Sequence, residues 1–217
     1  MALESQGIIM NHKKIQGIMR SHGMQTRVRR RNPYRSIMKK GPEDVSTPNI
    51  LNREFTQGVP RKILCTDITY IKFFTRFVYL SVVKDVASGE IVAWYCDRSL
   101  HLPLVLNTLK QLDDDMYHGS LLHSDQGWHY TNTRYVNMVR DLGIQRSLSR
   151  RGNCIDNAPV ESFFGHLKDE LDISQCRSFE ELCMCIDEYM NYYNTKRPQW
   201  DKQKMTPVQY RDHLISS

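Results

Sequence analysis

No stretch of this 217-residue sequence is apolar over the roughly 18 to 20 residues that a membrane-spanning helix needs. The start of the chain also lacks the basic segment and apolar run that mark a secretory signal peptide. The six cysteines have no repeated spacing, and no paired C-x2-C and H-x3-5-H pattern is present, so neither disulfides nor a zinc site is expected. These absences argue against membrane-inserted and secreted proteins and predict a cytoplasmic protein with free thiols.

Internal repeats and low-complexity segments are absent as well. Hydrophobic residues make up 40% of the chain and charged residues 25%, a composition that is typical of a globular protein and not of a disordered or fibrous one. The length allows one full domain and a smaller appendage.

Positive charge is concentrated near the N-terminus. Residues 1–55 contain 11 Lys and Arg against 4 Asp and Glu, whereas residues 56–217 contain 19 against 20. A basic segment attracts nucleic-acid phosphates through charge and counterion release. The sequence therefore predicts nucleic-acid contact here, with the candidates Lys13, Lys14, Arg29, Arg30 and Arg31. The alternative interpretation is a solvated linker that only keeps the chain in solution.

The N-terminal segment is predicted to be organised separately from the rest. Ile15, Ile18 and Met19 recur at helical spacing, which predicts a short amphipathic helix over 11–22. Three prolines within 41–60 indicate a linker that ends near residue 58. We therefore expect a basic helical segment and linker over 1–57 and a folded core over 58–217.

The core begins with three β-rich runs. Strands are expected over 63–71, 77–84 and 91–96, with a turn at 85–89, which together predict an antiparallel meander. Two shorter strands, 121–123 and 144–149, each follow a predicted helix. Such crossovers allow the later strands to lie parallel to an earlier one, so the fold class is α/β.

Four helices are expected in the core. The first starts at Ser99 and Pro103, and the second spans 133–142 and ends before Gly143. The third starts after Asp156 or Asn157 and ends near 171. The last starts at Ser178, with Glu181 three residues on as a capping box. Tyr189 and Tyr193 in the last helix are interpreted as core residues.

Three carboxylates stand where ordinary packing does not favour them. Asp67 lies within a predicted strand, although Asp is depleted in strands and unfavourable to bury unpaired. Asp125 directly follows the fourth strand, at the edge where α/β sheets bind ligands. Glu161 lies early in the helix after the polar loop 150–155. If the three converge, they need a hard divalent cation to offset their mutual repulsion, and Mg²⁺ with substrate phosphates fits a site that handles phosphodiesters.

The alternative is that these acids are structural, with Asp67 capping a turn, Asp125 capping a helix and Glu161 solvated. Two histidines, His123 and His129, flank Asp125. Contact with DNA or with a metal-bound water, and packing, are equally compatible with their positions.

Three segments closely resemble the integrase-like DDE transposases of bacterial insertion sequences. They are Thr66–Tyr70, His123–Tyr130 and Ser147–Phe164, and 35 residues separate Asp125 from Glu161, as in that family. Lys168, seven residues past Glu161, stands where the family carries a basic residue. The resemblance continues through 192–198 and 206–210 and thus spans nearly the whole chain.

The resemblance implies a ribonuclease H-like fold, a five-stranded mixed sheet flanked by helices. It implies that Asp67, Asp125 and Glu161 are catalytic and bind two Mg²⁺ ions, or Mn²⁺, when DNA is bound. It also implies DNA cleavage and strand transfer on element ends and target DNA by a homo-oligomer associated with the nucleoid. Further DNA-binding candidates are Lys168, Arg150, Arg151 and Asn153.

Two alternatives to an active transposase stay open at this stage. One is a truncated, non-catalytic DNA-binding remnant of such an enzyme, and metal-dependent cleavage of element ends distinguishes the two. The other is ribonuclease H-type hydrolysis of RNA–DNA hybrids, since one fold hosts several functions.

Overall fold

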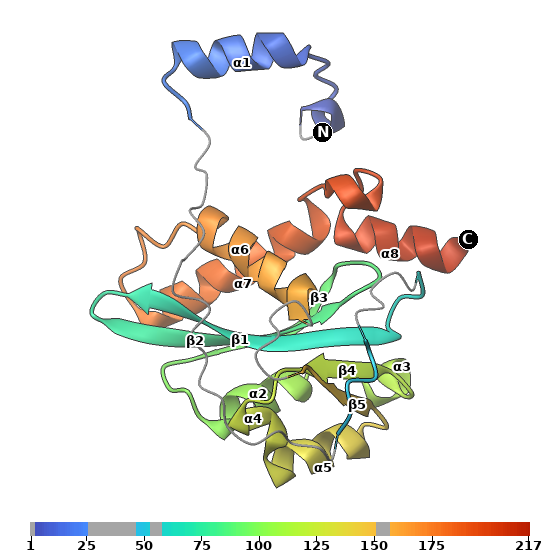
Figure 1. Cartoon of the computed structure of the whole chain (residues 1–217). Coiled ribbons are helices and arrows are strands. Elements are labelled where there is room, and N and C mark those ends of the chain that lie inside the picture. Colours follow the sequence, from blue (N-terminus) through green and yellow to red (C-terminus); the bar gives the residue numbers. More distant parts are fainter. Residues whose placement is uncertain (1–2, 26–46, 53–57, 151–156) are drawn as a thin grey trace.

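The computed structural model describes residues 3–25, 47–52, 58–150 and 157–217. Its centre is a five-stranded sheet in the order β3-β2-β1-β4-β5 (Figure 1). The strands are β1 (Ile63–Phe73), β2 (Arg76–Asp85), β3 (Ile91–Asp97), β4 (Leu121–Ser124) and β5 (Gln145–Leu148). All five strands lie where the sequence predicts them.

The sheet is mixed, as predicted. β1 pairs with β2 and β2 pairs with β3 in antiparallel register, which is the expected meander. β4 lies parallel to β1, and β5 lies parallel to β4. Since the connections into β4 and β5 contain helices, each strand runs in the same direction as its neighbour, and β4 pairs with the first residues of β1, Ile63 to Cys65.

Helices cover both faces of the sheet (Figure 1). One face carries α6 (Ala158–Glu170) and α7 (Phe179–Thr195), and the other carries α2 (Leu102–Leu109), α4 (Trp128–Thr131) and α5 (Thr133–Asp141). The remaining helical elements are η1 (Glu4–Gln6), α1 (His12–Ser21), α3 (Asp114–Tyr117), η4 (Trp200–Lys202) and α8 (Pro207–Ser216). The sequence analysis predicted α1, α2, α5, α6 and α7 but not α3, α4, η4 or α8.

The caps were predicted only in part. Gly143 follows α5 with φ of +67°, a left-handed conformation that favours glycine, as expected. The prediction that Ser99 caps α2 was wrong, because the helix starts at Leu102 after His101, with Pro103 in its first turn. At α7, Ser178 Oγ accepts from the Glu181 amide at 3.1 Å, but Glu181 accepts from the amide of Arg177, so the capping box is incomplete.

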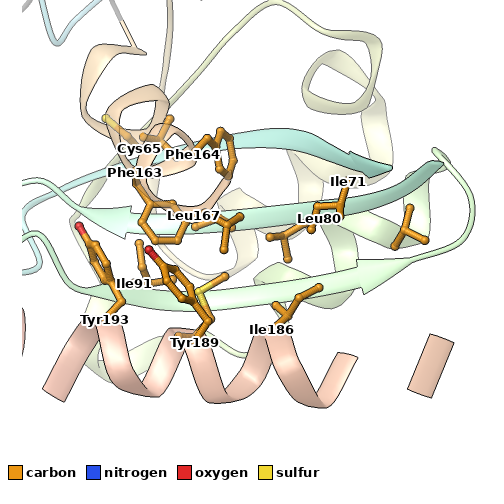
Figure 2. Close-up of a cluster of buried hydrophobic side chains, with 14 of the residues drawn as sticks. Cys65, Ile71, Leu80, Ile91, Phe163, Phe164, Leu167, Ile186, Tyr189 and Tyr193 are labelled. Atoms are coloured by element: carbon orange, nitrogen blue, oxygen red, sulfur yellow. The ribbon is translucent and has the colours of Figure 1, made fainter. Parts of the chain in front are cut away.

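The apolar core between the sheet and α6 and α7 is rich in aromatic rings (Figure 2). Phe163 lies within 4.8 Å of Tyr193, measured between ring centroids, in an edge-to-face arrangement. Phe163 and Tyr193 are almost fully buried and Tyr189 is buried, so Tyr189 and Tyr193 are core residues, as predicted.

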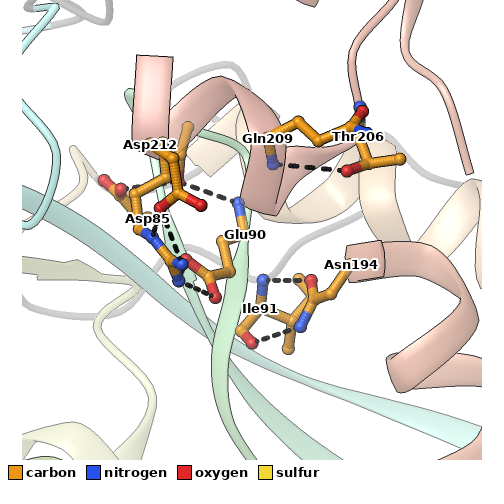
Figure 3. A network of polar contacts seen from close by, with 9 residues as sticks. Asp85, Glu90, Ile91, Asn194, Thr206, Gln209 and Asp212 are labelled. Carbon is orange, nitrogen blue, oxygen red and sulfur yellow. Dashed lines mark hydrogen bonds and ion pairs between the residues drawn. The ribbon is translucent and has the colours of Figure 1, made fainter. Parts of the chain in front are cut away.

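The C-terminal elements are attached to β3 by polar contacts (Figure 3). Asn194 of α7 bonds both backbone groups of Ile91, its Oδ1 accepting from the amide and its Nδ2 donating to the carbonyl, each at 2.9 Å. Arg211 of α8 donates to both carboxylate oxygens of Glu90 at 2.7 and 2.8 Å. Since β3 is an edge strand, Asn194 satisfies backbone groups that no neighbouring strand reaches.

Replacing Asn194 with Ala should destabilise the chain by about 2 kcal/mol, because two buried backbone groups lose their partners. The measurement is urea unfolding followed by circular dichroism. Asn191→Ala on the exposed side of the same helix is the matched control and should change the free energy of unfolding by less than about 0.5 kcal/mol. Equal midpoints for the two variants would contradict this role of Asn194.

Part of the segment predicted as linker packs on the core. Leu51 is 2% exposed and belongs to the cluster under α6. The amides of Ile50 and Leu51 donate to Ser147 Oγ on β5 at 3.0 and 3.2 Å. Residues 48–51 therefore lie against the edge strand β5.

The N-terminal helix α1 lies within its predicted range, with Asn11 as its cap. It has no buried residue, and Lys13 and Lys14 are exposed. Arg29, Arg30 and Arg31 lie outside the described residues. Among the helices that the structure describes, none is long and apolar enough to cross a bilayer.

Candidate active site

Asp67 lies on β1, and Asp125 directly follows the neighbouring parallel strand β4. β1 and β4 pair in register at Cys65 and His123, and each aspartate stands two residues further along the chain. Parallel strands lie about 4.8 Å apart, so the two carboxylates start from adjacent positions at one edge of the sheet. Alternation along β1 places Asp67 on the face of Cys65 and Ile71, the face that α6 covers.

Asp125 is held by the short loop before α4. Its Oδ1 accepts from the Gly127 amide at 2.8 Å. Burial raises the pKa of Asp125 above its usual value, while the Gly127 hydrogen bond and the charge of His129 act in the opposite direction. A carboxylate whose anion is penalised by burial is one that a bound cation would stabilise.

Gly127 leaves room for that carboxylate. A Cβ at this position would lie 2.9 Å from Asp125 Oδ1. The backbone of Gly127 has φ of −60° and ψ of 147°, which any residue adopts. The requirement for glycine here is therefore space beside Asp125 and not backbone freedom.

Helix α6 brings Glu161 alongside β1. At its start, Asn157 Nδ2 donates to the Thr66 carbonyl at 3.1 Å. Towards its end, Lys168 Nζ lies 4.6 Å from the centroid of the Tyr70 ring. Glu161 lies between these two anchor points on α6, as Asp67 lies between them on β1, and it is half-buried.

Tyr130 of α4 lies close to both aspartates. Its side chain is 2% exposed, and its pKa is raised well above the usual value, first by burial and then by the charges of Asp67 and Asp125. One buried phenol thus senses both carboxylates, which supports their proximity. The raised pKa keeps the Tyr130 hydroxyl protonated at all physiological pH values, so it adds no negative charge to the site.

The two histidines that flank Asp125 are packed inside. His123 is fully buried, and its Nδ1 lies 2.9 Å from Ser147 Oγ. Because that oxygen already accepts from two backbone amides, its proton points to His123 Nδ1. His129 is 5% exposed with its pKa lowered chiefly by burial. Packing is therefore the interpretation that fits both residues.

Two of the predicted DNA-binding residues of this region lie within the described residues, and both are exposed. They are Lys168 on α6 and Arg150 after β5. Arg151 and Asn153 fall outside the described residues. Lys168 is on the same helix as Glu161. Arg150 follows Ser149, whose amide donates to the carbonyl of Ser124, the residue before Asp125.

The donor set fits a hard divalent cation, because all three predicted ligands are carboxylates. Within the described residues, no group of three or more His, Cys, Asp and Glu side chains is arranged ready to hold a metal ion. The structure brings Asp67 and Asp125 to one sheet edge and α6 beside them, while the convergence of all three side chains stays a prediction.

Sequence reasoning missed three residues that position the site. Gly127, Tyr130 and Asn157 all lie in the segments that carry the family resemblance, yet only Asn157 was given a role, as a helix cap. Asn157 stands at the predicted position before α6, but its side chain makes no capping hydrogen bond with that helix. The side-chain amide of Asn157 instead donates to the Thr66 carbonyl on β1. A contact between residues this far apart in the sequence leaves no periodic signal.

Comparisons with protein families agree with this geometry. Residues 59–154 match a family model described as an integrase core domain, and residues 161–215 match a second model with the same description. The first range includes Asp67 and Asp125, and the second starts at Glu161.

Similar proteins cover almost the whole chain. It is 39% identical over 211 residues to an uncharacterized transposase-like protein of Haemophilus influenzae, with 96% of each chain covered. It is 34% identical over 215 residues to the putative transposase InsK for insertion sequence element IS150 of Escherichia coli K12, which covers 98% of this chain and 75% of that protein.

Solved structures confirm the ribonuclease H-like fold. The HTLV-2 integrase catalytic core domain in complex with magnesium has a TM-score of 0.56 at 18% identity, covering 70% of this chain and 97% of that one. A chain of the simian T-cell lymphotropic virus intasome complex has a TM-score of 0.64 at 18% identity, covering 72% of this chain and 56% of that one.

Proposed function

Since the chain belongs to the integrase-core transposases of bacterial insertion sequences, we propose that it cuts DNA at the ends of such an element and joins these ends to target DNA. As an integrase-core protein, it is an enzyme of the polynucleotidyl transferase type. The proposal concerns its residues: Asp67, Asp125 and Glu161 form the catalytic site. The observation that carries it is the parallel register of β1 and β4, which pairs Cys65 with His123, since Asp67 and Asp125 each stand two residues further along the chain.

The reaction consists of two displacements at phosphorus. Water attacks the phosphodiester at the element end and releases a 3′-hydroxyl, and this hydroxyl then attacks a target phosphodiester, whose 3′-oxygen leaves. Bound Mg²⁺ or Mn²⁺ ions would supply Lewis-acid stabilisation of the attacking and leaving oxygens. In each displacement the attacking oxygen forms a bond to phosphorus while the bond to the leaving 3′-oxygen breaks. No covalent link between protein and DNA is therefore required.

The chain's own groups hold the components in place. Asp67 and Asp125 would hold the cations from the side of the sheet, and the Gly127 amide fixes one oxygen of Asp125. Glu161 closes the site from α6, whose start is held at Thr66 by Asn157. Lys168 places an ammonium two helical turns from Glu161, where it would bind a DNA phosphate.

Assembly on DNA is part of the proposal. The titles of the similar viral structures describe dimeric and trimeric integrase cores and an intasome. We infer that this chain also acts as a homo-oligomer that binds element ends and target DNA. The comparisons do not favour the non-catalytic alternative, since the similar proteins of insertion sequences are named as transposases.

The test is incubation of the purified chain with Mg²⁺ or Mn²⁺ and a labelled duplex that ends in the element's terminal repeat. Nicking at the repeat boundary and joining to a second duplex are expected, and chelation by EDTA should abolish both. An absence of any metal-dependent cleavage would overturn the proposed activity.

Deletion of residues 1–40 should weaken DNA binding and flatten its dependence on salt. The segment contains ten Lys and Arg against one Glu, and each lost phosphate contact lowers the slope of log K against log salt by about 0.9. Fluorescence anisotropy between 50 and 200 mM salt is the measurement. The control is the melting temperature, which should hold because α1 buries no residue. An unchanged salt slope would favour the linker interpretation.

A further inference from the structure

The hairpin formed by β1 and β2 extends beyond the rest of the sheet, and its strands can be followed in Figure 1. The pairing of β4 with β1 ends at Cys65, and the pairing of β3 with β2 begins at Tyr79. In the part of the chain that the structure describes, residues 71–73 of β1 and 76–78 of β2 pair only with each other. We call residues 70–77 the hairpin tip.

The hairpin tip exposes aromatic rings. Tyr70, Phe74 and Phe77 are 58%, 63% and 49% exposed. The rings of Tyr70 and Phe77 meet edge to face with centroids 5.1 Å apart, and those of Phe73 and Phe74 are 4.5 Å apart. Grouped exposed aromatics are uncommon on a soluble surface and mark a binding site.

Phe74 has an unfavourable backbone conformation. The pairing of Phe73 with Arg76 leaves Phe74 and Thr75 as a two-residue turn, in which Phe74 has φ of +50°. Gly or Asn is the usual residue in this left-handed region, and a bulky ring there is strained. Strain that stability does not require points to a role for the ring itself.

The tip is also positively charged. No Asp or Glu occurs between residues 68 and 84, whereas Lys72 and Arg76 lie in the tip. Neither of these cations has an ion pair with any residue that the structure describes. Lys168 adds a third cation, stacked over Tyr70. Aromatic faces among cations match a polyanion with flat, apolar rings, which is an unpaired DNA strand.

The position of the tip relative to the carboxylates fits such a ligand. Tyr70 lies three residues past Asp67 along β1, or about 10 Å, and its side chain starts from the opposite face of the strand, where Lys168 of α6 reaches its ring. Lys168 lies about 10 Å past Glu161 along α6. Since successive phosphates of one strand are about 3.4 Å apart along a duplex, the tip begins about three nucleotides from the reacting phosphodiester.

We propose that the tip of the β1–β2 hairpin binds unpaired bases of the DNA strand next to the cut, through stacking on Phe74 and Tyr70 and phosphate contacts from Lys72, Arg76 and Lys168. This inference rests on the proposed function, because it takes DNA at the carboxylates as given. A fully paired end offers no open base faces at these positions, so the tip favours a frayed end over a closed one.

The test compares two DNA ligands of the same sequence in EDTA, one a fully paired duplex and one with its last few base pairs mismatched. Fluorescence anisotropy with the full chain should show tighter binding to the frayed duplex. Phe74→Gly should weaken binding to the frayed duplex by about five- to tenfold and leave binding to the paired duplex unchanged. The variant should not lower the melting temperature, because Gly suits the positive φ.

Trp200→Ala is the matched control. Trp200 is also exposed, at 75%, and carries Lys204 over its ring at 5.4 Å, but it lies in η4. The Trp200→Ala variant should bind both duplexes with the affinity of the wild type. The inference would be overturned if Phe74→Gly and Trp200→Ala lost equal affinity for the frayed duplex. It would also be overturned if Phe74→Gly kept the wild-type preference for the frayed duplex. A shift of Phe74→Gly to smaller oligomers with DNA binding intact would also overturn it, in favour of contact between copies of the chain.

Failure of the inference and failure of the proposed function give different results. Binding in EDTA needs no cleavage, and Asp125→Asn should keep the preference for the frayed duplex. Metal-dependent cleavage without any such preference would refute the role of the hairpin tip alone. A preference without cleavage in Mg²⁺ and Mn²⁺ would refute the catalytic proposal alone.

Discussion

Asp67→Asn, Asp125→Asn and Glu161→Gln should each reduce metal-dependent DNA cleavage and strand transfer by at least about a thousandfold. Each change removes one negative charge from the proposed cation site and nearly preserves the size of the side chain. The fold should survive, since the core packing around these positions is apolar and unaffected. Cleavage of a labelled terminal-repeat duplex on a denaturing gel measures the effect, and the melting temperature reports on folding.

Asp141→Asn is the matched control for these three variants. Asp141 is an exposed carboxylate at the end of α5, paired with Arg140 at 3.1 Å. Its replacement should leave cleavage within about twofold of the wild type, because exposed ion pairs contribute little. Robust cleavage by any one of the three site variants would eliminate that carboxylate as a catalytic ligand.

Gly127→Ala should lower cleavage by roughly a hundredfold with little change in stability. The new Cβ would lie 2.9 Å from Asp125 Oδ1, so the carboxylate must shift, and displacements of about 1 Å at a reacting centre have effects of this size. The backbone angles of Gly127 suit alanine, so the substitution isolates the position of the carboxylate from backbone strain. Single-turnover cleavage rates in saturating Mn²⁺ measure the chemical step.

Gly58→Ala controls for the added methyl group. Apart from Gly58 itself and its chain neighbours, no atom of the described residues lies within 4 Å of a Cβ at this position, so cleavage should stay unchanged. A Gly127→Ala variant that cleaves as fast as Gly58→Ala would show that Asp125 tolerates displacement, and it would remove Gly127 from the positioning of the site.

The strands and most core helices were predictable because their signals are local. Alternating and β-branched residues mark β1, β2 and β3, and apolar spacing marks α5 and α7. The parallel direction of β4 and β5 also follows from local features, because a helix between strands allows a parallel return. Asp67 stood out for the same reason, as a carboxylate within an apolar strand.

The contacts that shape the site were not predictable from local patterns. The bond from Asn157 to Thr66 joins residues 91 positions apart, and the bond from Asn194 to Ile91 joins residues 103 positions apart. Residues 48–51 looked like linker because their sequence has no periodicity, yet Leu51 is buried under α6. Such contacts depend on which surfaces the fold brings together, and the sequence of one segment does not encode its partner.

Helix α8 shows how a short element is missed. Its start carries a capping box, in which Thr206 Oγ1 accepts from the Gln209 amide and Gln209 Oε1 accepts from the Thr206 amide. The helix has only one buried residue, Pro207, so its apolar periodicity is weak. Capping chemistry was the available signal, and the contact of Arg211 with Glu90 attaches the helix to the core.

The most direct test of the three-carboxylate site is a crystal structure of the chain grown with Mn²⁺, with anomalous diffraction used to locate the ion. The account predicts Mn²⁺ within about 2.5 Å of carboxylate oxygens from Asp67 and Asp125. With DNA bound, it predicts a second ion about 3.5 to 4 Å away that contacts Glu161. Anomalous density elsewhere, or Glu161 directed to solvent in the DNA complex while the aspartates hold the ion, would contradict the account.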